Sequence, residues 1–219
     1  MQLLIDAWTF ILQNPVRFGQ SLFTHIVLSL SALTTACAIA IPLGIVLADR
    51  QRGALAAINL ANVGRTLPSL AVLALVMPIL GTGFVPSWFA LTLLALPPIL
   101  INTYTAVREV DADAIDAARG MGMDNLQIIG RIKLPLALPV LFAGVRTAAV
   151  QVVSGAVLAS YIGGGGLGDF ITAGIAMMAV PQLLVGAIPA TLLSLGTDFL
   201  FGRIQRWLTP KGIQPQAAA

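Results

Sequence analysis

Long runs of apolar residues, separated by short polar links, dominate the pattern along this chain. A helix needs about 20 apolar residues to cross a hydrocarbon core of roughly 30 Å. The runs reach this length, and none shows the regular alternation of apolar and polar positions that is typical of a transmembrane β-barrel. The pattern therefore predicts five transmembrane helices, at residues 26–48, 54–80, 86–107, 134–162 and 180–201.

The composition supports a membrane protein. Of the 219 residues, 58% are hydrophobic and 10% are charged. Soluble domains carry about 25% charged residues, so most of this chain cannot face water. We expect an all-α polytopic membrane protein, with residues 1–219 forming a single transmembrane domain whose core lies at about 20–205. No internal repeat is visible, and five helices make a thin wall for a solute pathway, so we expect a second copy or a related chain to complete it.

The basic residues predict how the chain crosses the bilayer, because Lys and Arg accumulate in cytoplasmic links. The links at 81–87 and 163–178 carry neither residue and are predicted to face outward. Five spans then place the N-terminus outside and the C-terminus in the cytoplasm, and Arg17 is the exception to this rule. The basic residues are scattered rather than gathered on a face, which argues against nucleic-acid binding despite the net charge of +3. The predicted cytoplasmic links carry Arg50, Arg52, Arg108, Arg119, Arg131, Lys133, Arg203, Arg206 and Lys211.

One polar segment, residues 108–135, interrupts the apolar pattern and holds five of the nine acidic and four of the twelve basic residues. Asp111 or Asp113 can cap a short helix at its N-terminus, and two glycines after that helix allow a bend. Asp124 followed by Gln127 fits a capping box at the start of a second helix. Two amphipathic helices joined in this way would form a knuckle for a cytosolic partner. Periodicity alone equally allows a loop that packs only on its own bundle.

The spacing within this segment decides between the two interpretations. Asp-Ala-Ala is followed after three residues by Gly, and after nine more by Ile-x-Leu-Pro. This resembles the EAA loop of permease subunits in binding-protein-dependent ABC importers, with Asp in place of Glu at the first position. The shorter side chain keeps the carboxylate but reduces its reach by one methylene. The resemblance makes residues 109–135 the ATPase-coupling loop and assigns the contact to Asp116, Ala117, Ala118, Gly122, Ile132, Leu134 and Pro135.

Further segments are similar to type I importer permeases: 66–70 (TLPSL), 97–104 (PPILINTY), 144–148 (GVRTA) and 163–168 (GGGGLG). Within that family they resemble the osmoprotectant branch, which imports glycine betaine, choline or carnitine. The end of the chain, from residue 188 to 210, also favours this branch. Permeases of methionine importers are close relatives with a glycine-rich stretch of their own, so a methionine or other amino-acid importer remains the alternative.

The resemblance implies a transport subunit without a catalytic site or cofactor of its own. Two permease subunits would form the pathway in the bacterial cytoplasmic (inner) membrane, surrounded by lipid. A dimer of cytosolic ATPases would bind ATP and Mg²⁺, and an extracytoplasmic binding protein would deliver the solute. Few aromatic residues are present and none are clustered, so the aromatic cage that commonly holds a quaternary ammonium is expected in the binding protein.

Two arginines stand within apolar runs. Arg65 precedes a stretch of 15 residues that is too short to span the bilayer, and Arg146 lies about three turns into the fourth run. Charges at such depth usually face the interior of a bundle or a wet cavity, so both are candidates for the pathway or a gate. The alternatives are snorkelling to the interface and pairing with Glu109 or Asp198.

The glycine-rich stretch formally satisfies G-x-G-x-x-G, but it follows an apolar helix rather than a strand, so nucleotide binding is not expected. Gly163 and Gly166 are instead candidates for a flexible exit from the fourth span or part of an outer gate. His25 is expected at the membrane interface, with no residues spaced to form a metal site. An ion-driven secondary transporter would show inverted repeats and acidic residues within its spans, neither of which is seen. A structural or assembly protein is a further alternative.

Overall fold

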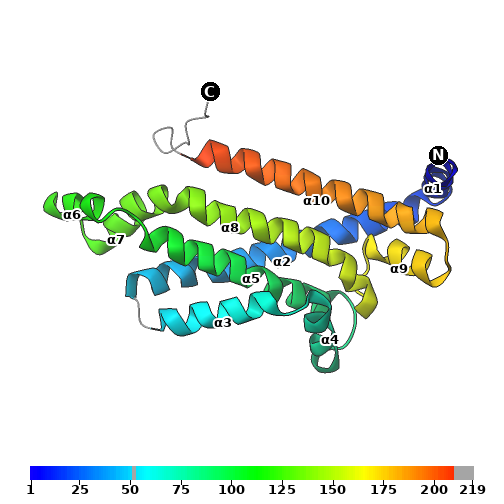
Figure 1. Ribbon diagram of the computed structural model, residues 1–219, viewed down its shortest axis with the longest axis horizontal. Coiled ribbons are helices and arrows are strands. Elements are labelled where there is room, and N and C mark those ends of the chain that lie inside the picture. The colour runs from blue at the N-terminus through cyan, green and yellow to red at the C-terminus, as the bar shows by residue number, and fades with distance from the viewer. Residues whose placement is uncertain (51–52, 210–219) are drawn as a thin grey trace.

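The computed structural model describes residues 1–50 and 53–209, and this part of the chain is helical throughout, without strands (Figure 1). The predictions made for Arg52, Pro210 and Lys211 fall outside the described residues. The elements are α1 (Gln2–Gln13), α2 (Pro15–Arg50), α3 (Ala54–Thr66), α4 (Ser69–Leu80), α5 (Phe84–Arg108), α6 (Ala112–Gly120), α7 (Asn125–Ile128), the π-helical turn η1 (Ile129–Lys133), α8 (Leu134–Gly155), the 3-10 helix η2 (Ala156–Ile162), α9 (Gly168–Ala176) and α10 (Val180–Leu208).

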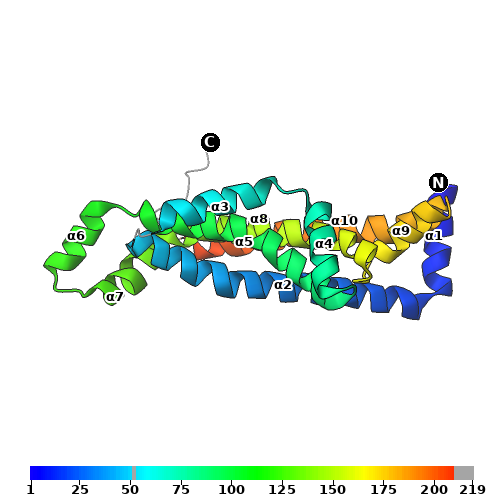
Figure 2. The same cartoon turned by 90° about the horizontal axis from the view of Figure 1, so that it is seen from below.

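Four long helices, α2, α5, α8 and α10, run along the long axis of the molecule (Figures 1 and 2). In the described residues, four helical stretches are long and apolar enough to cross a membrane, and they include the predicted first, third, fourth and fifth spans. α5 packs between α2 and α8 over most of its length, and α10 lies along α8. Small residues allow this close approach: Gly44 faces Thr103, and Gly144 faces the backbone of Pro98. The all-α polytopic fold is confirmed.

The predicted second span, residues 54–80, is not one helix. It is divided into α3 and α4, which are bent by 102° relative to each other. Pro68 lacks a backbone N–H, and the residue before a proline is disfavoured in a helix. Leu67 accordingly has an extended backbone, with φ −70° and ψ 128°. The apolar pattern did not reveal this bend, because hydropathy continues across it unchanged.

Two helices were not predicted, α1 and α9. In Figure 2, α1 crosses the end of the bundle nearly at right angles to the long helices. α1 and α9 are joined by a small apolar cluster of Ala7, Phe170 and Val185, with Phe10 at its edge. Arg17, the exception to the charge rule, lies 5.3 Å from the Phe170 ring centroid and contributes a cation–π contact there.

The links separate into two ends of the bundle. α6 and α7 lie at one end, and the C-terminal end of α2 reaches the same end (Figure 1), where Lys133 pairs with Asp49 over 3.1 Å. At the other end the two links without Lys or Arg meet, because the Gly83 amide donates to the Ile162 carbonyl over 2.7 Å. The structure thus groups the links as the charge pattern predicts. Which end faces the cytoplasm stays a prediction.

Candidate functional site

The polar segment folds into two short helices, each capped by its own sequence. The Asp111 side chain accepts a hydrogen bond from the Asp113 amide over 2.9 Å, so Asp111 is the cap of α6. Asp124 accepts from the Gln127 amide over 2.8 Å, and Gln127 accepts from the Asp124 amide over 3.1 Å. These two reciprocal bonds complete the capping box at α7, as predicted. A local side chain therefore satisfies one backbone donor in the first turn of each helix.

Gly122 sets the direction of the chain between α6 and α7. Its φ is +83°, in the left-handed region that residues with a side chain rarely adopt. The Gly122 amide donates to the Arg119 carbonyl, and the Met123 amide donates to the Ala118 carbonyl. These two bonds close the end of α6 in a tight turn. The glycine of the motif is thus explained by backbone geometry alone.

The outer surface of this loop is polar with two prominent apolar side chains. Asp116 is exposed and pairs with Arg119 over 3.2 Å on the same helix. Ala118 is buried, whereas Met121 is 70% exposed and Leu126 is 81% exposed. Two large exposed apolar side chains make this otherwise polar loop a candidate protein-binding surface. The neighbouring Ala117 is exposed on the same helix.

The second half of the motif forms the base of the loop. Ile132 lies in the π-helical turn η1, and Leu134 and Pro135 begin α8 directly after it. Proline cannot donate to the preceding turn and its ring crowds the carbonyl four residues earlier, which accounts for the wider turn here. Lys133, in this turn, makes the contact to Asp49 at the end of α2. The first half of the motif therefore lies in α6 and the turn after it, and the second half forms the turn that leads into α8.

The capping box provides a direct test of loop order. We expect Asp124→Ala to destabilise α7 by about 1 kcal/mol, because the Gln127 amide loses the side-chain oxygen that accepts its hydrogen bond. Faster amide hydrogen exchange at Gln127 and Ile128 would be the readout. Asp113→Ala is the matched control, since the Asp113 side chain does not cap α6. Equal exchange in both variants would contradict the role of the box.

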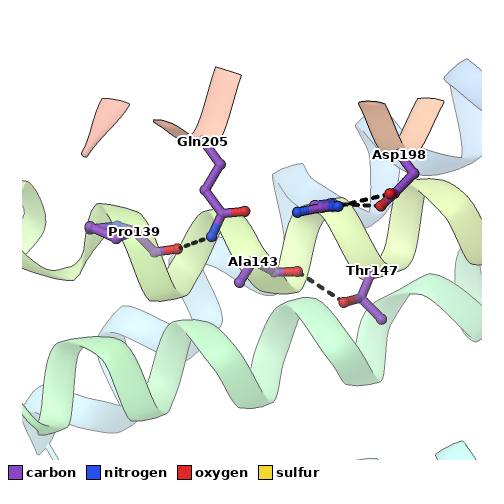
Figure 3. Close-up of polar contacts among 6 residues, drawn as sticks. Pro139, Ala143, Thr147, Asp198 and Gln205 are labelled. Carbon is purple, nitrogen blue, oxygen red and sulfur yellow. Dashed lines mark hydrogen bonds and ion pairs between the residues drawn. The ribbon is translucent and has the colours of Figure 1, made fainter. Parts of the chain in front are cut away.

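Arg146 forms a two-pronged ion pair with Asp198, which links α8 to α10 (Figure 3). Nε donates to one carboxylate oxygen over 2.7 Å, and Nη2 donates to the other over 2.8 Å. Of the two partners that the sequence allowed, the structure selects Asp198 rather than Glu109. About two helical turns away on the same pair of helices, the Gln205 side chain donates to the Pro139 carbonyl over 3.0 Å. Both side chains of the ion pair border an open cleft of about 600 Å³.

Arg65 lies apart from this pair. It occupies the last turn of α3, immediately before the bend, and it is exposed. Neither of the two clefts bordered by Asp198 includes it. The two arginines that the sequence grouped together therefore belong to different parts of the bundle.

The glycine-rich stretch is a tightly packed link rather than a loose one. Gly163 and Gly166 have positive φ values of 75° and 93°, and Gly166 is buried. A Cβ on Gly166 would lie 3.2 Å from His25 Nδ1, and one on Gly164 would overlap the side chain of Ser87. The link is thus wedged between α2 and the start of α5. It follows the 3-10 helix η2, and the described residues contain no strand.

The prediction of an interfacial His25 is wrong. His25 is 1% exposed, and its Nε2 lies 3.0 Å from the Val153 carbonyl of α8. It is buried because α2 begins ten residues before it, and because the glycines of the link at residues 163–168 leave room for the imidazole ring. In the described residues no group of side chains is arranged to hold a metal ion.

Sequence reasoning also missed a set of polar residues on the facing sides of α8 and α10. They line the clefts beside the ion pair. Their spacing of three and four residues within apolar runs is the signal that could have revealed them. The set comprises Thr147, Gln151, Ser154, Thr191 and Ser194.

These features define a multi-pass membrane subunit with a structured loop at one end. The chain belongs to the family of inner membrane components of binding-protein-dependent transport systems, whose model matches residues 40–213. It is therefore an ABC transporter permease subunit, located in the inner membrane.

Two relatives cover nearly the whole chain. The carnitine transport permease protein OpuCB of Listeria monocytogenes is 43% identical over 206 residues, which span 94% of each chain. The choline transport system permease protein OpuBB of Bacillus subtilis (strain 168) is 41% identical over 88% of each chain. A solved structure of the MetNI methionine ABC transporter in an inward-facing conformation has a TM-score of 0.78 to this chain. It covers 90% of this chain and 99% of that one at 21% identity, and it shows the shared fold.

Proposed function

We propose that this chain is the permease of an ATP-driven importer of quaternary-ammonium osmoprotectants such as glycine betaine, choline or carnitine. The observation that carries the proposal is the identity of about two residues in five, over nearly the full length, with permeases named for carnitine and choline. A third relative of Bacillus subtilis, 38% identical, is named for glycine betaine, carnitine and choline. The methionine alternative is supported only by a shared fold.

The loop at residues 109–135 would transmit the work of the ATPase to the bundle. In this proposal ATP and Mg²⁺ bind only to a cytosolic ATPase dimer, and this chain has no catalytic site or cofactor. Closure of that dimer would draw the loops of two permease subunits together. ATP would favour the state of the transporter in which the ATPase dimer is closed, because it binds to that state more tightly. Support comes from the capped helices and the exposed Met121 and Leu126. The contact residues would be Asp116, Ala117, Ala118, Gly122, Ile132, Leu134 and Pro135.

The opposite end of the bundle would receive the solute from an extracytoplasmic binding protein. This places the N-terminus outside and the C-terminus in the cytoplasm, consistent with the grouping of basic links at the loop end. The pathway would lie between this chain and a second permease, identical or related. Gly163 and Gly166 are proposed to shape the outer gate, and Arg65 and Arg146 to border the pathway.

Reconstitution tests the proposal. The chain, its ATPase and any paired permease are placed in vesicles with ATP and Mg²⁺ on the ATPase side and the binding protein on the other. We expect uptake of labelled glycine betaine, carnitine or choline that requires both ATP and the binding protein. Methionine uptake alone would support the alternative substrate. Ion-gradient-driven uptake by this chain without the ATPase would contradict the proposed class.

A further inference from the structure

The ion pair between Arg146 and Asp198 occupies an unusual position. Arg146 lies twelve residues, or about 18 Å of helix, beyond the start of α8 at Leu134. Asp198 lies on α10, ten residues before its end at Leu208. Both therefore belong to segments that cross the membrane. The side chains are nevertheless 36% and 48% exposed on the surface of the single chain. Charges exposed to hydrocarbon are costly, so this face must adjoin water or protein.

The surroundings of the pair favour a wet cleft. One cleft, of about 600 Å³, is bordered by both charges, and a second, mostly apolar cleft of about 710 Å³ extends from Asp198 between α8 and α10. Gln151 borders both clefts, and its amide, like the charges, is poorly suited to lipid. The hydroxyl groups along the two helices donate to carbonyls of their own helix and keep oxygen lone pairs that can accept from water.

The pair leaves part of its bonding capacity unused. A guanidinium carries five N–H donors, and the contact with Asp198 uses the edge formed by Nε and Nη2. Each carboxylate oxygen accepts one bond from Arg146 and has a further lone pair. Gly202 lies against the guanidinium, where a Cβ would be 3.2 Å from Cζ, so the flat group fits closely against α10. A bidentate arginine of this kind is well suited to bind a carboxylate.

Glycine betaine and carnitine are zwitterions that carry a carboxylate and a quaternary ammonium, whereas choline has only the ammonium. We propose, building on the function above, that Arg146 and Asp198 form a solute contact in the pathway. In this contact the internal ion pair opens, Arg146 binds the solute carboxylate, and Asp198 faces the quaternary ammonium. Each charge thus keeps a partner of opposite sign. Arg146 and Asp198 face each other without solute, and each faces one end of the zwitterion when solute is bound. The contact therefore favours zwitterionic solutes over choline.

The test compares glycine betaine with choline in reconstituted vesicles at a saturating concentration of loaded binding protein. The double variant Arg146→Gln/Asp198→Asn removes both charges and leaves neither unpaired. We expect the ratio of betaine uptake to choline uptake to fall about tenfold, because a site built to bind a polar group rejects an analogue that lacks this group, and the variant loses that discrimination. ATP hydrolysis stimulated by the binding protein serves as the measure of intact assembly.

Two further variants separate a solute contact from a structural link. Arg146→Lys keeps the charge but loses the planar fork, and we expect the same ratio to fall about threefold. Gln205→Ala removes an uncharged contact between the same two helices, to the Pro139 carbonyl, and we expect the ratio to stay at the wild-type value. Since Arg146→Lys retains a cation for Asp198, it remains informative if the double variant does not fold.

The outcomes distinguish this inference from the function on which it rests. An equal fall in the uptake of both solutes, or an unchanged ratio in Arg146→Lys, would show that the pair is only structural. ATP-dependent uptake of choline but of no zwitterion by the wild-type protein would likewise overturn the inference while supporting the osmoprotectant importer. Absence of ATP-dependent uptake of all three solutes by the wild-type protein would instead count against the proposed function.

Discussion

Gly122→Val is expected to abolish ATP-dependent solute uptake while leaving the chain inserted in the membrane. Gly122 has φ +83°, and a β-branched residue is strongly disfavoured in that region. An added Cβ would meet no other atom within 4 Å, so the space next to this position is open. The expected damage is therefore confined to the turn that connects α6 to α7. If the turn at Gly122 adopts another backbone conformation, the loop presents a different surface to the ATPase.

Gly120→Val is the matched control for this experiment. Gly120 ends α6, two residues before Gly122, its φ is not positive, and a Cβ there also meets no atom within 4 Å. We expect this variant to retain most of the uptake. The measurements are uptake and ATP hydrolysis in reconstituted vesicles, normalised to the amount of chain in the membrane. Wild-type uptake by Gly122→Val would refute the coupling role of the turn.

Gly144→Val is expected to cause a near-complete loss of folded protein. A Cβ on Gly144 would lie 2.5 Å from Asn102 Cβ and 2.7 Å from the Pro98 carbonyl oxygen. The carbonyl belongs to the backbone of α5 and cannot rotate away, so α5 and α8 would have to separate. These two helices form one of the main packing interfaces of the bundle. In membranes small residues hold such interfaces together through close van der Waals contact.

The control for this second variant is Gly196→Val in the middle of α10, where a Cβ would meet no atom within 4 Å. Both substitutions add the same side chain to a membrane-spanning helix. We expect Gly144→Val to yield little monodisperse protein in detergent and Gly196→Val to yield near wild-type amounts. Equal yields and equal thermal unfolding temperatures would show that the approach of α5 and α8 is less restrictive than the structure indicates.

The loop at residues 109–135 was predictable because its structure is determined over a few neighbouring residues. Asp124 and Gln127 are three apart and form both bonds of the capping box without help from the bundle. Gly122 is required by the backbone of its own turn. The sequence left Asp111 and Asp113 as alternative caps, and only the geometry of the first turn selected Asp111. The roles of these residues toward an ATPase stay predictions.

Contacts between distant segments were not predictable in the same way. Arg146 and Asp198 are 52 residues apart, and the sequence offered Glu109 as an equal partner until the packing of α10 on α8 was known. His25 looked interfacial because its position along the apolar run says nothing about the link at residues 163–168 that covers it. The bend between α3 and α4 was hidden because both helices are apolar.

The sequence by itself determined the membrane class, four of the spans, the grouping of the links and the local structure of the loop. These properties depend on hydropathy within one run, on charge within one link and on short-range hydrogen bonds, all of which are local in the sequence. Only the tertiary structure decided the course of residues 54–80, the partner of Arg146 and the face on which the polar side chains of α8 and α10 meet. Each of these depends on how helices pack, and packing is a relation between surfaces that are remote in the sequence.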